Sequence, residues 1–93
     1  SLTLIRGDVF RYLHSAPAQG FDFIFADPPY ALKELPEVPE LVFKRDLLRD
    51  GGIFVMEHPK TNDFSGLPYF YQHRVYGSVN FSIFIKEEEK TDA

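Results

Sequence analysis

One short stretch, Asp27-Pro28-Pro29-Tyr30, combines residue types that can do chemistry, and it follows an apolar run directly. A residue before a proline is kept out of the helical region, so Asp27 and Pro28 are both held extended. Neither proline has an N–H that would compete for hydrogen bonds. The stretch therefore predicts a stiff turn that offers a carboxylate and carbonyl oxygens as acceptors beside the flat ring of Tyr30.

Such a turn suits a planar amino group on a heterocycle. The group could donate both of its N–H bonds to the acceptors of the turn while Tyr30 stacks on the ring. Two acceptors favour a pyramidal nitrogen and free its lone pair, which is otherwise delocalised into the heterocycle. The pattern therefore favours methyl transfer to the exocyclic amine of a base, with catalysis by positioning and electrostatics. The alternative is a rigid strand exit in which Asp27 only caps the next turn.

Three apolar runs predict strands around this turn. Phe21–Ala26 is apolar except for Asp22, a pattern typical of a strand that is covered on both faces of a parallel sheet. Ile53–Met56 is a second buried run and leads to Glu57-His58-Pro59-Lys60. A shorter run, Thr3–Ile5, predicts a first strand.

Two helices are predicted between these strands. Asp8 can cap the first helix, which runs through Phe10, Tyr12 and Leu13. The second helix begins within Leu35–Pro39, and Asp50-Gly51-Gly52 ends it with glycine in the left-handed cap position. Its apolar stripe consists of Val38, Leu41, Val42 and Leu48.

The last part of the chain predicts a β-hairpin. Its strands are Tyr69–Tyr76 and Val79–Ile85, and Gly77-Ser78 is the connection. In the second strand an apolar face is formed by Val79, Phe81, Ile83 and Ile85. Strand–helix alternation followed by a hairpin predicts an α/β domain with a mostly parallel sheet that ends in an antiparallel β-hairpin.

Polar clusters follow the three predicted parallel strands directly, at Asp8, Asp27–Tyr30 and Glu57–Lys60. Ligands of open α/β sheets bind beyond the carboxyl ends of the strands, so we expect these clusters on one rim. Lys60 could contact a phosphate, but an exposed loop is the better interpretation of His58-Pro59-Lys60. The histidines and acids lack the spacing of a metal site, and we predict none.

Composition and charge bound the class of protein. The 93 residues are 44% hydrophobic and 16% aromatic, too apolar for a disordered chain. There is no cysteine and no apolar run near the ~20 residues of a membrane span, which fits a cytoplasmic protein that contacts no membrane. We expect residues 1–86 to form the domain and residues 87–93 an acidic, disordered tail. Because this tail carries much of the net charge of −4, charge neither supports nor excludes a nucleic-acid substrate.

The tetrapeptide Asp27-Pro28-Pro29-Tyr30 resembles the Asp/Asn-Pro-Pro-aromatic motif of S-adenosylmethionine-dependent amino-methyltransferases. The whole chain resembles the C-terminal half of the catalytic domain in the bacterial 16S ribosomal RNA guanine-N2 methyltransferase family. The features that support this are Gly7-Asp8 before a helix, Phe21–Tyr30, the helix ending at Gly52, Ile53–Glu57 and Val75-Tyr76-Gly77.

The resemblance implies a partial Rossmann-like class I methyltransferase fold with S-adenosyl-L-methionine as its cofactor. The implied reaction is methyl transfer to guanine N2 of small-subunit ribosomal RNA or its precursor. The same tetrapeptide occurs in adenine-N6 and cytosine-N4 DNA methyltransferases, which are one alternative. A non-catalytic α/β module that binds RNA or a partner is the other.

The resemblance also implies roles for single residues. Asp27 and the carbonyl of Pro28 would hold the target amine, and Pro29 would keep the turn rigid. Tyr30 would stack on the base. Asp8, with the backbone of Val9, would contact the adenine of the cofactor, although a simple helix cap is the other interpretation of Asp8.

In that family the glycine-rich cofactor loop, and the acidic residue that binds the ribose hydroxyls, lie upstream of the first strand of this chain. Neither occurs in the sequence, and we therefore expect the 93 residues alone to be inactive. The family's sheet order also puts the missing strands between Thr3–Ile5 and Phe21–Ala26. Their loss would leave an apolar sheet edge, so we expect the chain to self-associate or to rearrange its first strand.

Overall fold

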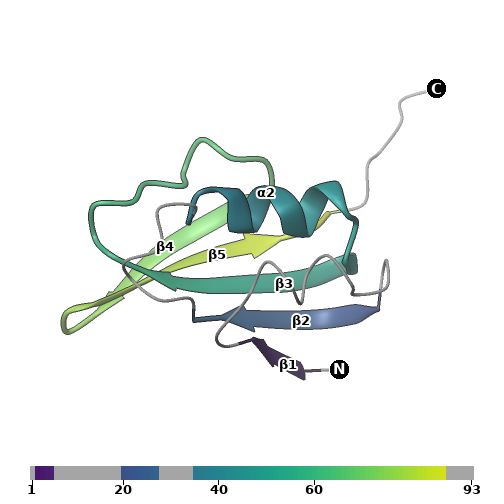
Figure 1. Ribbon diagram of the computed structural model, residues 1–93, viewed down its shortest axis with the longest axis horizontal. Helices are drawn as coiled ribbons and strands as arrows, with labels where there is room; N and C mark the ends of the chain where they lie inside the picture. The colour runs from purple at the N-terminus through teal and green to yellow at the C-terminus, as the bar shows by residue number, and fades with distance from the viewer. Residues whose placement is uncertain (1, 6–19, 28–34, 88–93) are drawn as a thin grey trace.

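The computed structural model describes residues 2–5, 20–27 and 35–87. These residues form a five-stranded sheet with a helix on one face (Figure 1). In chain order the elements are β1 (Leu2–Ile5), β2 (Phe21–Ala26), α2 (Glu37–Lys44), β3 (Leu48–His58), β4 (Phe70–Tyr76) and β5 (Val79–Ile85). The helix predicted from Asp8 through Leu13 lies outside the described residues.

The order of strands in the sheet is β1-β2-β3-β5-β4. β1, β2 and β3 run parallel, whereas β5 pairs antiparallel with both β3 and β4. Gly77, with a φ of 60°, and Ser78 form the predicted turn between β4 and β5. A glycine in the first turn position suits a type II′ hairpin. The structure confirms an α/β sheet that starts parallel and ends in an antiparallel hairpin.

β1 lies directly beside β2, with Leu2 opposite Phe23 and Ile5 opposite Ala26. The resemblance puts further strands between these two. Of the two expected outcomes, the structure therefore has the rearranged first strand, because β1 pairs with the edge of β2 that would otherwise be open. Self-association stays a prediction.

The end of α2 differs from the prediction. The helix ends at Lys44, and just beyond it Asp46 takes a left-handed conformation with a φ of 53°, which aspartate tolerates better than most residues. Leu48 does not extend the helical stripe, because it is the first residue of β3 and pairs with Phe21. The prediction that Asp50-Gly51-Gly52 caps the helix is therefore wrong.

The two glycines lie instead in an irregular part of β3. The register between β2 and β3 shifts between Phe21 and Phe23, so the chain of β3 bulges here. Gly51 has a φ of 81°, a conformation that favours glycine. A Cβ atom on Gly52 would lie 2.7 Å from the backbone oxygen of Arg49. The pair thus permits the bulge.

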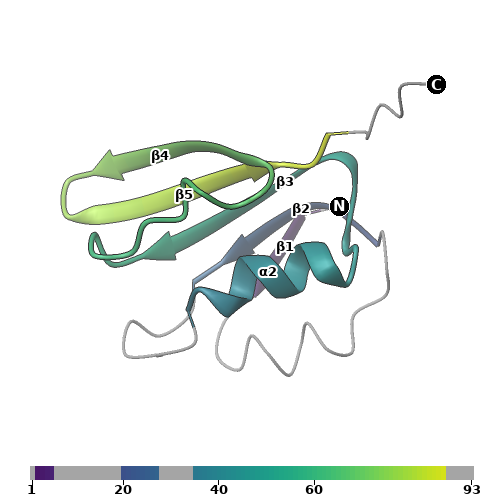
Figure 2. The same cartoon turned by 90° about the horizontal axis from the view of Figure 1, so that it is seen from above.

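The core lies between α2 and the sheet (Figure 2). Val38 and Val42 of α2 are fully buried and pack against strand residues that include Ile24, Ala26, Phe54, Met56 and Phe84. The rings of Phe54 and Phe84 stack with centroids 5.5 Å apart. Burial of one such side chain contributes about 1.5–3 kcal/mol, and the fully buried apolar side chains of the described residues belong mainly to this core.

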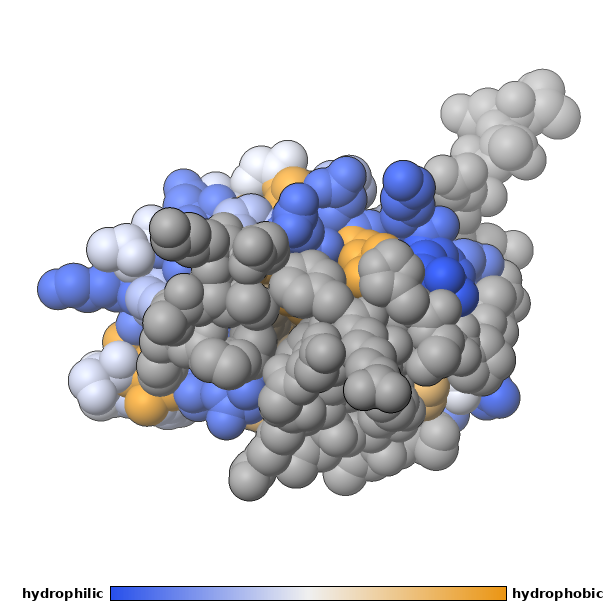
Figure 3. Space-filling model, viewed as in Figure 1, coloured by the Kyte–Doolittle hydropathy of each residue, from blue (hydrophilic) through white to orange (hydrophobic). Residues whose placement is uncertain are grey.

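The opposite face of the sheet is less covered. Its half-buried side chains on the three central strands include Phe23, Phe25, Ile53, Val55, Phe81 and Ile83. The predicted alternation of β5 is present, because Val79, Phe81, Ile83 and Ile85 share this half-buried face. Asn80, Ser82 and Phe84 are buried on the other face. On the side seen in Figure 3, hydrophobic side chains show as small patches between hydrophilic ones, with one patch near the hairpin turn.

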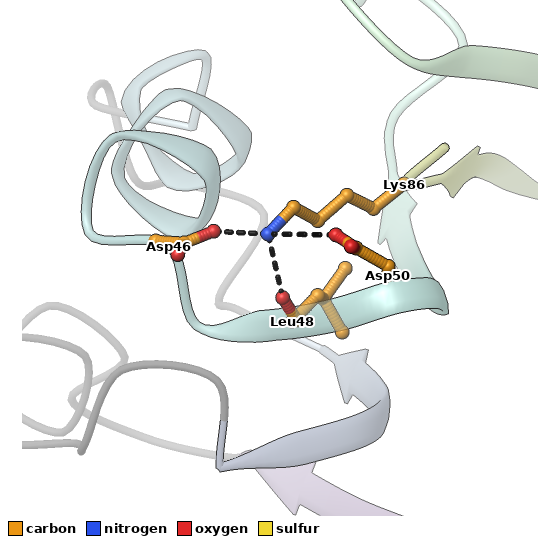
Figure 4. A network of polar contacts seen from close by, with 4 residues as sticks. All are labelled: Asp46, Leu48, Asp50 and Lys86. Carbon is orange, nitrogen blue, oxygen red and sulfur yellow. Dashed lines mark hydrogen bonds and ion pairs between the residues drawn. The ribbon is translucent and has the colours of Figure 1, made fainter. Parts of the chain in front are cut away.

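Lys86 joins three elements at the amino end of β3 (Figure 4). Its ammonium group donates to the carboxylate of Asp46 and, at 2.9 Å, to the carbonyl oxygen of Leu48, and Asp50 lies 3.7 Å away. Burial by itself would lower the pKa of Lys86. The hydrogen bond to Asp46 and the charges of Asp46 and Asp50 outweigh burial and raise this pKa.

Candidate active site

Asp27 leaves β2 at its carboxyl end and is half-buried. The β2–β3 register ends with Ala26 opposite Met56, so Asp27, just beyond β2, and Glu57 of β3 follow adjacent positions of the sheet. Five other predicted site residues lie outside the described part of the chain: Asp8, Val9, Pro28, Pro29 and Tyr30.

The three parallel strands end at the same edge of the sheet. Ile5 is opposite Ala26, and Ala26 is opposite Met56, so these residues form one transverse line. The residues that follow the strands therefore start from a common rim, as the sequence predicts. In sheets of this kind the rim is where ligands bind.

A row of residues from three strands, with Asp27 just beyond the end of a fourth, crosses the sheet at this rim. Glu57 pairs with Phe81 of β5, and Phe81 pairs with Arg74 of β4. Asp27 extends the row beyond the end of β2. Because side chains alternate along a strand and the neighbouring Ala26 and Met56 face the core, the row lies on the face opposite α2. We refer to Asp27, Glu57, Phe81 and Arg74 as the carboxyl-edge row.

Sequence reasoning places Asp27 and Glu57 on the rim but misses Phe81 and Arg74. Their place depends on β5 lying between β3 and β4, and this order is set by pairing between distant segments. The available signal was the alternation of β5, which puts Phe81 on the face away from Ser82. The structure thus adds an aromatic ring and a cation to the predicted carboxylates.

His58 ends β3 on the face of the sheet that α2 covers, and it is only 1% exposed. The interpretation of His58-Pro59-Lys60 as an exposed loop is therefore wrong for His58, although Lys60 is exposed. Nδ1 of His58 lies 2.8 Å from the carbonyl oxygen of Pro59, and Nε2 lies 2.7 Å from the hydroxyl of Ser82. Because a carbonyl can only accept, Nδ1 carries the proton and Nε2 accepts from Ser82.

A second histidine extends this cluster. The ring of His73 lies 5.2 Å from that of His58, and its Nε2 is 2.9 Å from Oδ1 of Asn80. Burial lowers the pKa of His58; the Pro59 carbonyl acts against this, and the nearby His73 lowers the pKa further. His58 is therefore neutral at pH 7. Asn80 and Ser82, two polar residues alternating in an apolar strand, were the sequence signal for this buried cluster.

The chemistry of the rim fits the predicted cofactor in one respect. The sulfonium of S-adenosylmethionine is a cation, and Asp27 and Glu57 place two carboxylates at this edge. The pair Gly51-Gly52 lies near the other end of β3 and is part of a strand rather than a cofactor loop.

Among the described residues, no three histidines and acids are placed to hold a metal ion. In the same residues no helix has the length and apolar character needed to span a membrane.

Solved structures share this fold. A Haemophilus influenzae protein proposed to be a methylase superposes with a TM-score of 0.70 at 18% identity, over 88% of this chain and 53% of that one. An Escherichia coli protein proposed to be a methyltransferase gives a TM-score of 0.67 at 18% identity, over 91% of this chain and 48% of that one. The chain therefore has a partial Rossmann-like methyltransferase fold and spans about half the length of these solved chains.

The family follows from the sequence match. The model of the family described as Conserved hypothetical protein 95 matches residues 1–85, and the chain belongs to this family. An uncharacterized methylase of Rickettsia prowazekii (strain Madrid E) is 43% identical over 44 residues, which make up 47% of this chain and 19% of that protein.

Proposed function

We propose that this chain is the part of an S-adenosylmethionine-dependent methyltransferase that binds and positions the target amine. The observation that carries the proposal is the place of Asp27, which leaves β2 at the carboxyl edge of a methyltransferase-fold sheet and directly precedes Pro28-Pro29-Tyr30. The proposed target is guanine N2 in small-subunit ribosomal RNA or its precursor, a substrate that the enzyme would meet in the cytoplasm.

The chain's own residues would bind and orient the base. Asp27 and the Pro28 carbonyl accept the two N–H bonds of the amine, Pro29 keeps the turn rigid, and Tyr30 stacks on the heterocycle. S-adenosylmethionine, when bound, would supply the methyl group. The amine loses one proton in the reaction, and of its two proposed acceptors only the carboxylate of Asp27 is basic enough to take it up. Catalysis of this kind depends on position and electrostatics rather than on a covalent intermediate.

The cofactor would be shared between this chain and the rest of the enzyme. Asp8 and the backbone of Val9 are proposed to contact its adenine. In the enzymes that this chain resembles, the glycine-rich loop and the ribose-binding acid come from a segment that precedes the part matched by these 93 residues. We therefore propose that the 93 residues alone do not turn over and that activity belongs to the full-length protein.

The comparisons support the class of reaction in this proposal. The Rickettsia prowazekii relative is named a methylase, and two of the solved proteins that share this fold are proposed to be a methylase and a methyltransferase. Support for a base amine as the target comes from the tetrapeptide at Asp27, and support for ribosomal RNA comes from the hairpin that contains Val75-Tyr76-Gly77.

A labelling experiment tests the proposed function. The full-length protein would be incubated with methyl-labelled S-adenosylmethionine and with under-methylated 30S subunits, free ribosomal RNA or DNA. We expect label in the 30S subunit or its RNA, recovered after digestion as N2-methylguanosine. Label in N6-methyladenine or N4-methylcytosine of DNA would favour the DNA methyltransferases instead. The absence of label from every substrate would favour a non-catalytic α/β module that binds RNA or a partner.

A further inference from the structure

The carboxyl-edge row places a second carboxylate beside the proposed catalytic one. Glu57 and Asp27 each follow one member of the last β2–β3 pair, Met56 and Ala26. Both side chains are half-buried, and the alternation of β3 puts Glu57 on the face opposite α2. Asp27 follows Ala26, the core-facing last residue of β2, directly. Neighbouring strands lie about 4.8 Å apart, so two adjacent donors of one small molecule can reach both carboxylates.

Guanine has two adjacent donors of this kind. Its N1–H and its 2-amino group lie side by side on the Watson–Crick edge. The ring nitrogen beside the 6-amino group of adenine is an acceptor, and so is the ring nitrogen beside the 4-amino group of cytosine. A second carboxylate next to Asp27 therefore attracts guanine and repels the two other bases, because an ionised carboxylate can only accept hydrogen bonds.

The rest of the row fits a nucleotide at this place. Phe81 lies between Glu57 and Arg74, and its ring centroid is 6.1 Å from that of Phe25 and 6.0 Å from that of Tyr76. Aromatic rings offer stacking surfaces for bases, and the exposed Arg74 can contact a phosphate. Acceptors, rings and a cation thus occur together on one face of the rim.

We propose that Glu57 determines the choice of base by accepting the N1–H of guanine while Asp27 accepts the 2-amino group. This inference rests on the proposed function and deepens it by naming the residue that separates guanine from adenine and cytosine. Glu57 acts on binding and orientation of the base. A purely structural Glu57 would leave the choice of base unchanged when glutamine replaces it, because glutamine keeps the size of the side chain.

The test compares guanosine with 2-aminopurine, which keeps the 2-amino group but has an acceptor at N1. Both would be placed at the labelled position of a synthetic RNA, and kcat/KM would be measured for the full-length protein and for Glu57→Gln. For the original protein we expect a preference for guanosine of about 10-fold or more, since hydrogen bonds to charged groups have this strength. Glu57→Gln should lose most of the guanosine rate and reduce the preference, because an amide can donate to N1 of 2-aminopurine.

Three further measurements make the result unambiguous. Glu57→Asp keeps the carboxylate and should keep the preference for guanosine at a lower rate. Glu40→Gln makes the same charge change at an exposed position of α2 and should leave both rates unchanged. The fluorescence of 2-aminopurine reports binding without cofactor, and Glu57→Gln should tighten binding of this RNA relative to the guanosine RNA.

An unchanged preference in Glu57→Gln would overturn the role of Glu57 while leaving the proposed function intact. Equal rates for guanosine and 2-aminopurine in the original protein would also overturn the role of Glu57 and leave the proposed function intact. If the original protein methylates neither RNA, the proposed function fails, and the inference fails with it. These outcomes are distinguishable because the rate on guanosine RNA alone reports the proposed function.

Discussion

Nε2 of His58 lies 2.7 Å from the hydroxyl of Ser82, a contact that joins the carboxyl end of β3 to the middle of β5 beneath the proposed site. Both groups are buried, and the ring of Phe64 covers His58 edge-on at 4.8 Å between centroids. The contact fixes the strand end from which Glu57 leaves on the opposite face. The stability of this end should therefore depend on the protonation of His58.

The first prediction concerns pH. Burial lowers the pKa of His58 in the folded chain below its ordinary 6.5, so the unfolded chain binds a proton more readily than the folded one. The stabilising contribution is complete above about pH 6.5 and is lost as the pH falls through the lowered pKa. Urea unfolding at pH 7.5 and 5.5 should show a larger loss of stability for the original chain than for His58→Gln. His73→Gln removes one smaller cause of the lowered pKa of His58, so its loss should lie between those of the original chain and of His58→Gln. Equal losses in all three would contradict the prediction.

A second prediction uses the glycine pair in β3. Gly52→Ala should lower the free energy of unfolding by about 1–3 kcal/mol, the usual cost of overpacking, because its Cβ would lie 2.7 Å from a backbone oxygen that cannot move aside easily. Gly66→Ala is the matched control, since no atom lies within 4 Å of its added Cβ. Chemical denaturation of both variants checks this. Equal stability of the two would show that the bulge is not as tightly packed as described.

The third prediction concerns Lys86, whose side chain is 12% exposed. It contacts the carboxylates of Asp46 and Asp50, which are more exposed than Lys86 itself. Lys86→Met should cost about 1 kcal/mol at pH 7, a modest value because solvent screens Asp46 and Asp50. The pKa of Lys86 is raised in the folded chain, so its contribution is complete below pH 10.5 and is lost as the pH rises through the raised pKa. The unfolding curves of the original chain and Lys86→Met should therefore converge in strong alkali. The exposed Lys44→Met serves as control. If the original chain and Lys86→Met still differ in stability in strong alkali, that result would argue against the network.

The fourth prediction concerns association of the isolated 93 residues. β1 is a four-residue edge strand in the described part of the chain, and an edge presents backbone groups that can pair with another chain. We expect the mass measured by light scattering to rise with concentration. Val75→Lys adds a charge to the opposite edge strand, β4, and should leave association through β1 unchanged. A monomer mass at every concentration would rule the prediction out.

The strands and their order along the chain could be predicted because apolar runs and turn residues are local signals. β2 matches its predicted bounds, and the hairpin matches within one residue. The boundary between α2 and β3 could not be predicted, because Asp46 rather than a glycine takes the left-handed position and Gly51 serves a bulge. Leu48 fits a helical stripe as well as a strand, and only its pairing with Phe21 decides between them.

The site was predictable to a similar degree. Asp27 could be placed on a rim because parallel strands end at the same edge of a sheet. The burial of His58 could not be predicted, since its partner Ser82 is 24 residues away in sequence and Phe64 covers it from a loop. The carboxyl-edge row could not be predicted for the same reason, because Phe81 and Glu57 become neighbours only through the pairing of β3 with β5.

Replacement of Asp27 by alanine in the full-length protein tests the central claim most directly. Methyl transfer from labelled S-adenosylmethionine to under-methylated 30S subunits should fall by about 100-fold or more, as expected for the loss of a group that orients and stabilises the reacting atoms. Asp63→Ala, at an exposed loop position, should retain activity, and unfolding curves would show that both variants fold. Full methylation by Asp27→Ala would falsify the catalytic assignment.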